Sequence, residues 1–254
     1  MIETLLVLGA SGDLTGRYLL PALAQLHDAD LLPESLAVVG VDRAEKSDDA
    51  FREEARKQLA THAPSLPRSA VDGVAARLRH RRADVTDADQ LTSALDGTAQ
   101  PVAAYLALPN TIFLTAVRAL AASGLPDGSR LVVEKPFGRD LADACSLNRA
   151  IRTRFNEEDV FRVDHFLARQ TVLNVLGLRF ANRVFEPVWN ALHVRAVDIV
   201  WDETLGLEGR AGYYDRAGAL KDMIQNHLLQ VLALVAMEPP TTLGHRDLRD
   251  RKVE

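Results

Sequence analysis

The chain has 254 residues, a formal net charge of -5 at pH 7 and a sequence pI of about 5.8. This charge gives no basic footprint for nucleic acid, and 47% hydrophobic with 26% charged residues is typical of a globular protein. No signal peptide is evident at the start, and no apolar run reaches the roughly 18 residues of a membrane span. The one cysteine, Cys145, cannot form an internal disulfide. We therefore expect a cytoplasmic protein in which Cys145 is a small packed residue rather than a nucleophile.

Apolar runs alternate with helix-forming stretches through the first part of the chain. Thr4 to Leu8 predicts a strand, followed by a glycine turn and a helix with Leu19 to Leu26 on its apolar side. Two surface helices are predicted between Asp48 and about Arg79, and another helix from about Ala88. Further strands are predicted at Leu36 to Val41, near Ala83, at Val102 to Leu108 and at Leu131 to Val133. This alternation predicts an α/β domain with a Rossmann-type, doubly wound parallel sheet over residues 1–160.

The turn after the first strand contains two glycines. One permits a tight turn, the other lets the backbone approach a pyrophosphate, and the following helix offers free N–H groups. An ordinary βα connection is an equally good interpretation, because the spacing is looser than the full GxGxxG fingerprint. The candidate cofactor residues in this turn are Gly9, Ser11, Gly12, Asp13 and Leu14.

The second predicted strand ends in Asp42 and Arg43. An acidic residue there would accept a hydrogen bond from a ribose 2′-hydroxyl, whereas an arginine would pair with a 2′-phosphate. Two solvated charges at the end of a strand are the alternative. We favour NADP, with NAD as a second option. A basic cluster nearby, which we interpret as a solvated face, comprises Arg77, Arg79, His80, Arg81 and Arg82.

The second part of the chain has a different pattern. Val172 to Trp189 predicts a helix and then a turn, and Val194 to Trp201 alternates as a strand does. A strand after a helix, without a further βα unit, predicts that residues 161–254 begin an α+β domain with a mainly antiparallel sheet. Within this part, Asp164 and His165 follow an apolar run. By themselves they could be a turn residue and a helix cap.

Four motifs in order resemble the glucose-6-phosphate dehydrogenase family: GASGDL, EKPFG, RVDHFLARQ and QNHLLQ. The resemblance covers essentially the whole chain and is most specific from Arg162 to Met237. It implies that Arg43 binds the NADP phosphate and that Pro109, in an ALP segment, lies beside the cofactor. It also implies that Lys135 hydrogen-bonds near the nicotinamide and the sugar, and that Pro136 positions the cofactor. A proline at this place fixes the backbone beside it, and a cis bond is one way to do so.

The resemblance further implies a catalytic base. Oxidation of a sugar at its anomeric carbon needs a group that removes the hydroxyl proton, and histidine suits that task near neutral pH. His227 matches the family's base, and Asp164 matches the carboxylate that fixes its tautomer. Without the motif, a satisfied core histidine would be the usual explanation for His227, which begins an apolar helix.

The resemblance implies a substrate site too. His165 and Arg169 match phosphate-binding positions, although Arg169 replaces a lysine, and Phe166 replaces a residue that is often tyrosine. The matched sugar-binding acids are Glu203 and Asp222. The family also carries a lysine near the substrate in the glycine-turn helix. Here that position is Tyr18, with Arg17 beside it.

The family members are longer than this chain, so the sequence looks truncated. The implied reaction is NADP-dependent oxidation of glucose 6-phosphate to 6-phosphoglucono-1,5-lactone, in the oxidative pentose phosphate pathway. The implied partner is a small sugar phosphate, and the full-length protein is expected to be a homo-oligomer, a dimer or a tetramer. We expect no nucleic-acid partner, no membrane and no metal. Two alternatives stay open: a related oxidoreductase acting on another sugar or sugar phosphate, and a non-catalytic nucleotide-binding fragment.

Overall fold

A computed structural model describes residues 1–202, 206 and 211–254. The chain divides into two compact units, Met1–Val163 and Asp164–Glu254, and Glu203 lies outside the described residues. In these described ranges, no helix combines the length and the apolar character needed to cross a bilayer.

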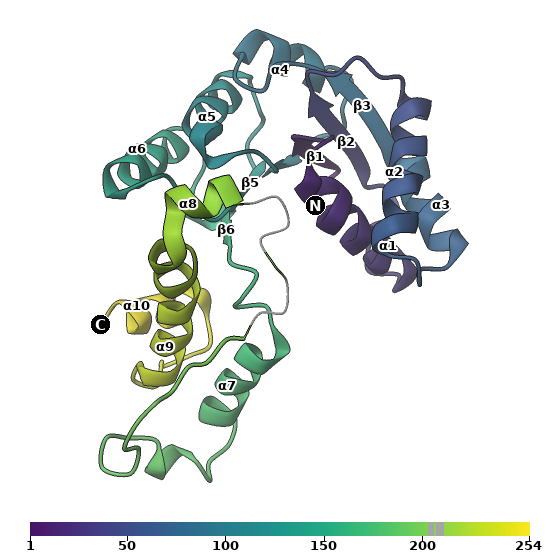
Figure 1. Ribbon diagram of the computed structural model, residues 1–254. Coiled ribbons are helices and arrows are strands. Elements are labelled where there is room, and N and C mark those ends of the chain that lie inside the picture. Colours follow the sequence, from purple (N-terminus) through teal and green to yellow (C-terminus); the bar gives the residue numbers. More distant parts are fainter. Residues whose placement is uncertain (203–205, 207–210) are drawn as a thin grey trace. The chain divides into compact units, whose positions relative to one another are not determined.

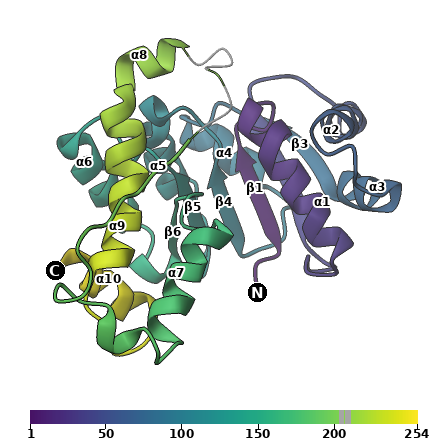
Figure 2. The same cartoon turned by 60° about the horizontal axis from the view of Figure 1, so that its bottom comes forward.

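Unit 1 is built on a six-stranded sheet in the order β3-β2-β1-β4-β5-β6, and every neighbouring pair is parallel. Strand β1 pairs with β2 on one side and with β4 on the other. Strands β4, β5 and β6 lie side by side (Figure 2). The strands are β1 (Thr4–Leu8), β2 (Ala37–Asp42), β3 (Leu78–Arg82), β4 (Val102–Leu106), β5 (Arg130–Glu134) and β6 (Val160–Val163). This topology confirms the predicted Rossmann-type domain.

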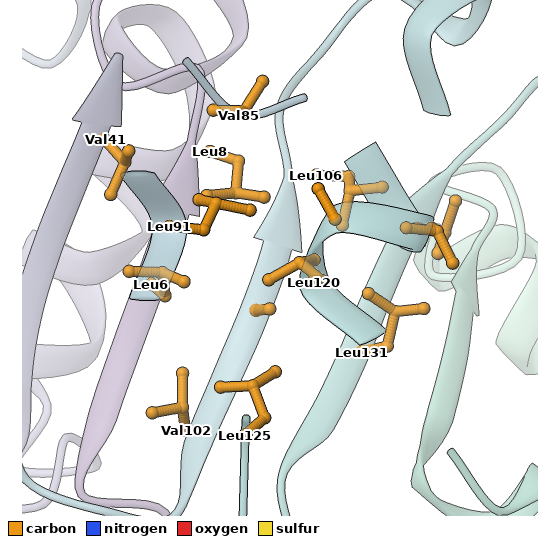
Figure 3. Close-up of a cluster of buried hydrophobic side chains, with 14 of the residues drawn as sticks. Leu6, Leu8, Val41, Val85, Leu91, Val102, Leu106, Leu120, Leu125 and Leu131 are labelled. Carbon is orange, nitrogen blue, oxygen red and sulfur yellow. The ribbon is translucent and has the colours of Figure 1, made fainter. Parts of the chain in front are cut away.

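Helices cover both faces of the sheet (Figure 1). Side chains alternate along each strand, so Leu6 and Leu8 point to one face and Val7 to the other. The first face is covered by α4 (Ala88–Leu95), α5 (Phe113–Ala122) and α6 (Leu141–Arg152), and Figure 3 shows this apolar cluster. The second is covered by α1 (Leu20–Asp28), α2 (Asp48–His62) and α3 (Arg68–Arg77). Short helical turns also occur at η1 (Thr15–Leu19), η2 (Asn110–Ile112) and η3 (Glu157–Asp159).

Two predictions in unit 1 need correction. The strand expected near Ala83 begins earlier, at Leu78, and contains most of the basic cluster. As an edge strand it tolerates exposed charges, so Arg79 and Arg82 are solvated as predicted, but His80 is only 4% exposed. Cys145 is exposed rather than packed, because α6 turns Leu147 and Ile151, and not Cys145, toward the core.

Unit 2 consists of helices and connecting segments. Its helices are α7 (Gln170–Phe180), η4 (Glu186–Val188), α8 (Ala211–Ala219), η5 (Leu220–Leu228), α9 (Leu229–Ala236) and α10 (His245–Val253). A small core joins α7 to α9 through Val172, Leu234 and Met237. The buried Arg179 of α7 donates hydrogen bonds to the carbonyl oxygens of Leu234 and Met237, at 2.6 Å and 2.7 Å, and so caps the end of α9.

The strand predicted from Val194 to Trp201 is wrong, because no regular secondary structure is assigned there. A strand exists only when a neighbour completes its hydrogen-bond ladder, and no strand is assigned among the described residues of unit 2. The apolar side chains of this segment stay in solvent, with Val197 44% and Val200 75% exposed. The expected antiparallel sheet is therefore not observed in the described part of unit 2.

Candidate active site

The glycine turn connects β1 to a helical segment, as the sequence predicts. Gly9 has a φ of 94°, and a Cβ placed on it would lie 2.3 Å from the carbonyl oxygen of Ala107, just beyond β4. Glycine is therefore required where the loops after β1 and β4 approach each other. This is the point at which the strand order reverses, where open α/β sheets bind ligands.

The rest of the turn is accessible. Ser11, Gly12 and Asp13 are exposed, whereas Leu14 packs against the apolar cluster under α1 and α2. Asp13 forms an ion pair of 3.3 Å with Arg17. The exposed backbone of the turn is therefore compatible with a dinucleotide pyrophosphate, and Leu14 supports the turn from below.

Asp42, at the end of β2, is hydrogen-bonded back to the glycine turn. Its Oδ2 accepts from the backbone N–H of Ser11 at 3.0 Å and from the Ser11 hydroxyl at 2.5 Å. Its Oδ1 accepts from the backbone N–H of Ala44 at 2.8 Å and lies 3.2 Å from Nε2 of His80. Burial would raise the pKa of Asp42, but the hydrogen bonds from Ser11, Ala44 and His80 lower it below its ordinary value.

The neighbours of Asp42 include cations. Lys46 Nζ lies 2.7 Å from Ser11 Oγ and forms an ion pair with Glu54, and Arg43 is exposed. Sequence reasoning missed His80 and Lys46. His80 belongs to a stretch interpreted as a solvated face, and Lys46 carries no motif.

Pro109, Lys135 and Pro136 follow the carboxyl ends of β4 and β5, which are neighbouring strands. The Lys135–Pro136 peptide bond is cis. Tyr105 in β4 donates a hydrogen bond to the carboxylate of Glu134, which precedes Lys135. Burial, together with this hydrogen bond and the charge of Glu134, raises the pKa of Tyr105, so the phenol stays protonated. The predicted cofactor residues of unit 1 thus lie after adjacent strands of one sheet.

In unit 2, the structure brings Asp164 and His227 together from positions 63 residues apart. Nδ1 of His227 lies 2.8 Å from Oδ1 of Asp164, and the two residues are 5% and 8% exposed. Asp164 follows directly after β6, and its Oδ1 also accepts the backbone N–H of Phe166 at 3.0 Å. His227 lies in η5, a π-helix, a conformation that is frequent at functional sites.

Aromatic rings surround this pair. The Phe166 ring stacks on the His227 ring, with centroids 4.1 Å apart and an interplanar angle of 12°. Phe166 also contacts Trp201, with ring centroids 4.6 Å apart, and the guanidinium of Arg169 lies over the Trp201 ring, 4.2 Å from its centroid. Trp201 belongs to no motif that indicates this role. These contacts fix the imidazole plane and hold the side chain of Arg169 in one direction.

The predicted phosphate and sugar residues lie near this pair. His165 packs against His227 at 4.8 Å between centroids. His165 is an exposed residue, but the partial burial of its ring and the charges of His227 and Arg169 lower its pKa, while Asp164 and Asp222 oppose the shift. Asp222 is therefore close enough for its charge to act on His165, whereas Glu203 lies outside the described residues.

Asp164, His165 and His227 each offer one donor atom, and these atoms lie within 4.8 Å of one another. Such a group could contact one metal ion. However, the 2.8 Å separation between Asp164 and His227 is that of a hydrogen bond, so the arrangement fits a proton-sharing pair without a metal.

Comparison with known protein families matches both units. Residues 6–174 match the family described as glucose-6-phosphate dehydrogenase, NAD binding domain, and residues 176–254 match glucose-6-phosphate dehydrogenase, C-terminal domain. The chain is 40% identical to glucose-6-phosphate 1-dehydrogenase of Zymomonas mobilis, over 100% of this chain and 53% of that protein. The chain is 42% identical to glucose-6-phosphate 1-dehydrogenase of Rhizobium meliloti, over 98% of this chain and 52% of that protein. The chain thus spans about half the length of these relatives.

Solved structures agree with this match. Glucose-6-phosphate 1-dehydrogenase from Mycobacterium avium superposes with a TM-score of 0.90 and 35% identity, covering 99% of this chain and 56% of that one. A glucose-6-phosphate dehydrogenase in complex with its substrate glucose-6-phosphate gives a TM-score of 0.86 and 31% identity, covering 99% of this chain and 55% of that one.

Proposed function

Because the chain belongs to the glucose-6-phosphate dehydrogenase family, we propose that the protein oxidises glucose 6-phosphate at C1 to 6-phosphoglucono-1,5-lactone. NADP is the proposed hydride acceptor and NAD the alternative. The observation that carries the proposal is the buried hydrogen bond between Asp164 and His227. A buried carboxylate beside an imidazole is the arrangement that general-base catalysis uses.

His227 acts as the base in this proposal. Its Nδ1–H donates to Asp164, which leaves the lone pair of Nε2 to accept the proton of the C1 hydroxyl. Asp164 then stabilises the imidazolium that forms, without taking the proton itself. A bound nicotinamide dinucleotide supplies the acceptor for the hydride that leaves C1. The products are the lactone, the reduced cofactor and a protonated His227, which returns its proton to water.

The substrate residues follow the same proposal. Arg169 and His165 hold the phosphate, since a guanidinium fork and an imidazole both donate hydrogen bonds to an anion. Asp222 and Glu203 accept hydrogen bonds from sugar hydroxyls, and Lys135 donates to the sugar near the nicotinamide.

The cofactor residues are proposed in unit 1. The pyrophosphate binds at the turn formed by Gly9, Ser11, Gly12, Asp13 and Leu14. Leu14 supports this turn by packing against the apolar cluster under α1 and α2. Arg43 pairs with the 2′-phosphate of NADP, whereas Pro109 and Pro136 line the nicotinamide side. We further propose a cytoplasmic homo-oligomer that acts on a small sugar phosphate in the oxidative pentose phosphate pathway.

The test is the initial rate of nicotinamide reduction by this chain with glucose 6-phosphate, with NADP and NAD measured separately. The matched control is His227→Asn, which should abolish turnover and leave NADP binding intact. Substantial activity of the His227→Asn variant would remove His227 as the base. NADP binding without any turnover by the unaltered chain would instead support a non-catalytic nucleotide-binding role.

A second candidate is a related oxidoreductase for another sugar or sugar phosphate. Its support is Tyr18, 56% exposed where the family carries a substrate lysine, and Arg169, which replaces a second lysine. A panel of sugars and sugar phosphates separates the two candidates. Preference for any compound over glucose 6-phosphate would favour the second.

A further inference from the structure

The carboxylate of Asp42 is anchored at the glycine turn. Both of its oxygens accept hydrogen bonds, Oδ2 from the N–H and O–H of Ser11, and Oδ1 from the N–H of Ala44, with His80 also at hydrogen-bond distance. Its side chain is 16% exposed, and that of His80 is 1% exposed. With contacts on both oxygens, Asp42 cannot rotate away from Ser11 without breaking several hydrogen bonds.

Two cations lie beside this anion. Arg43 is the next residue and is exposed, and Lys46 Nζ lies 2.7 Å from the same Ser11 hydroxyl that binds Asp42. Ser11 therefore lies between a fixed negative charge and a positive one. The pKa of Asp42 is below its ordinary value, which means that the negative charge is present at neutral pH.

The end of the second strand is where a Rossmann domain meets the adenosine ribose. A 2′-hydroxyl can donate a hydrogen bond to a carboxylate there. A 2′-phosphate would place a charge of roughly minus two beside the same carboxylate, and at such short range like charges repel strongly. Arg43 and Lys46 would attract that phosphate, so the two effects oppose each other in this chain.

We propose that Asp42 determines the cofactor preference, by opposing the 2′-phosphate that Arg43 and Lys46 attract, so that NAD competes with NADP. This inference rests on the dinucleotide site of the proposed function and goes beyond it in assigning the discrimination to one residue. Removing the carboxylate should leave Ser11, Arg43 and Lys46 facing the 2′-phosphate, with Glu54, the ion-pair partner of Lys46, as the carboxylate that remains in both the unaltered chain and the variant.

The test is equilibrium binding of NADP and NAD, measured by calorimetry on the unaltered chain and on Asp42→Ala and Asp42→Asn. We expect the ratio of the NAD to the NADP dissociation constant to rise by at least about tenfold in Asp42→Ala, and by a smaller factor in Asp42→Asn. Lys46→Gln should move the ratio in the opposite direction.

The matched control is Glu45→Gln. It removes one negative charge three residues away, from a side chain that is 86% exposed and paired with Arg82, so its ratio should stay within about twofold because solvent screens the charge. An unchanged ratio in the Asp42 variants overturns the proposal. An equal loss of affinity for NAD and NADP also overturns it, because that result would mean that Asp42 only supports the turn. If the unaltered chain binds neither dinucleotide, the proposed function itself fails, whereas a shifted ratio without sugar oxidation leaves this inference standing.

Discussion

Nδ1 of His227 lies 2.8 Å from Oδ1 of Asp164, and both side chains are shielded from solvent. In a site that excludes water, such a hydrogen bond fixes which imidazole nitrogen carries the proton. Because the proton is on Nδ1, Nε2 keeps a lone pair, and the proposed reaction needs this lone pair to accept a proton.

Asp164→Asn tests this relationship without changing the size of the side chain. An amide N–H facing Nδ1 would favour the opposite tautomer, so we expect kcat to fall by roughly 100- to 10,000-fold while NADP affinity is unchanged. The pair acts as a unit, so the double variant with His227→Asn should be no slower than the worse single variant. Multiplicative losses in the steady-state rates would contradict a shared role.

Trp201→Leu tests the support of Arg169. The guanidinium over the indole is a cation–π contact, with an expected effect of about 2- to 30-fold. We expect KM for glucose 6-phosphate to rise by that factor, with no change in KM for unphosphorylated glucose. The control is Trp189→Leu, which removes the other tryptophan of unit 2 and its hydrogen bond to Val235, at a distance from Arg169 along the chain. If both variants change the two KM values alike, Trp201 does not act through Arg169.

His165 provides a prediction about pH. Its pKa in the folded protein is lowered from the ordinary value of about 6.5, first by burial and then by the charges of His227 and Arg169. The unfolded chain therefore binds more protons below that value, and His165 should reduce stability as the pH falls from about 6.5 toward the folded pKa. A bound phosphate dianion should raise the pKa again.

Proton NMR titration of the His165 ring, with and without inorganic phosphate, measures both effects. The variant His165→Asn assigns the resonance and should remove this part of the stability loss between neutral and mildly acidic pH. An unshifted pKa, or one that phosphate lowers further, would exclude His165 from the phosphate site.

Gly9→Ala and Gly124→Ala separate two costs of replacing a glycine. Both glycines have a positive φ, 94° and 77°, but only at Gly9 does a Cβ meet backbone, at 2.3 Å from the oxygen of Ala107. We expect Gly124→Ala to reduce the free energy of unfolding by about 1–2 kcal/mol, and Gly9→Ala by more than about 3 kcal/mol. Urea denaturation of the two variants provides the comparison, and equal losses would mean that the loops after β1 and β4 relax easily.

The sequence predicted most elements of unit 1 because apolar strands there are separated by clear glycine and helix signals. The predicted bounds of Thr4–Leu8 agree with the structure at both ends. The second strand was predicted from Leu36 to Val41 and is observed one residue later, at Ala37–Asp42. The strand Leu78–Arg82 was harder, because an edge strand with charged side chains lacks the apolar run that marks a buried strand. In unit 2, Val194 to Trp201 has the alternation of a strand, but alternation alone cannot supply a hydrogen-bonding neighbour.

The candidate site depended on the resemblance more than on spacing. No local pattern relates Asp164 to a histidine 63 residues away. The two residues were paired only because the motifs that contain them resemble those of the family. His80 and Trp201 had no motif, and their contacts with Asp42 and Arg169 arise only when the chain folds. Charged or aromatic residues that support others in this way carry no signature of their own.

The π-helix that contains His227 makes the site depend on the exact number of residues in η5. A π turn holds one residue more than an α turn, so it is equivalent to a single-residue insertion into an ordinary helix. Deleting one residue before His227 would let the segment return to α geometry and would rotate the imidazole by roughly 100° around the helix axis. Asp164 and His227 would both still be encoded, but they would no longer face each other. Within this helix, a substitution at a position other than His227 or Asp222 is therefore a milder change than any shift in length.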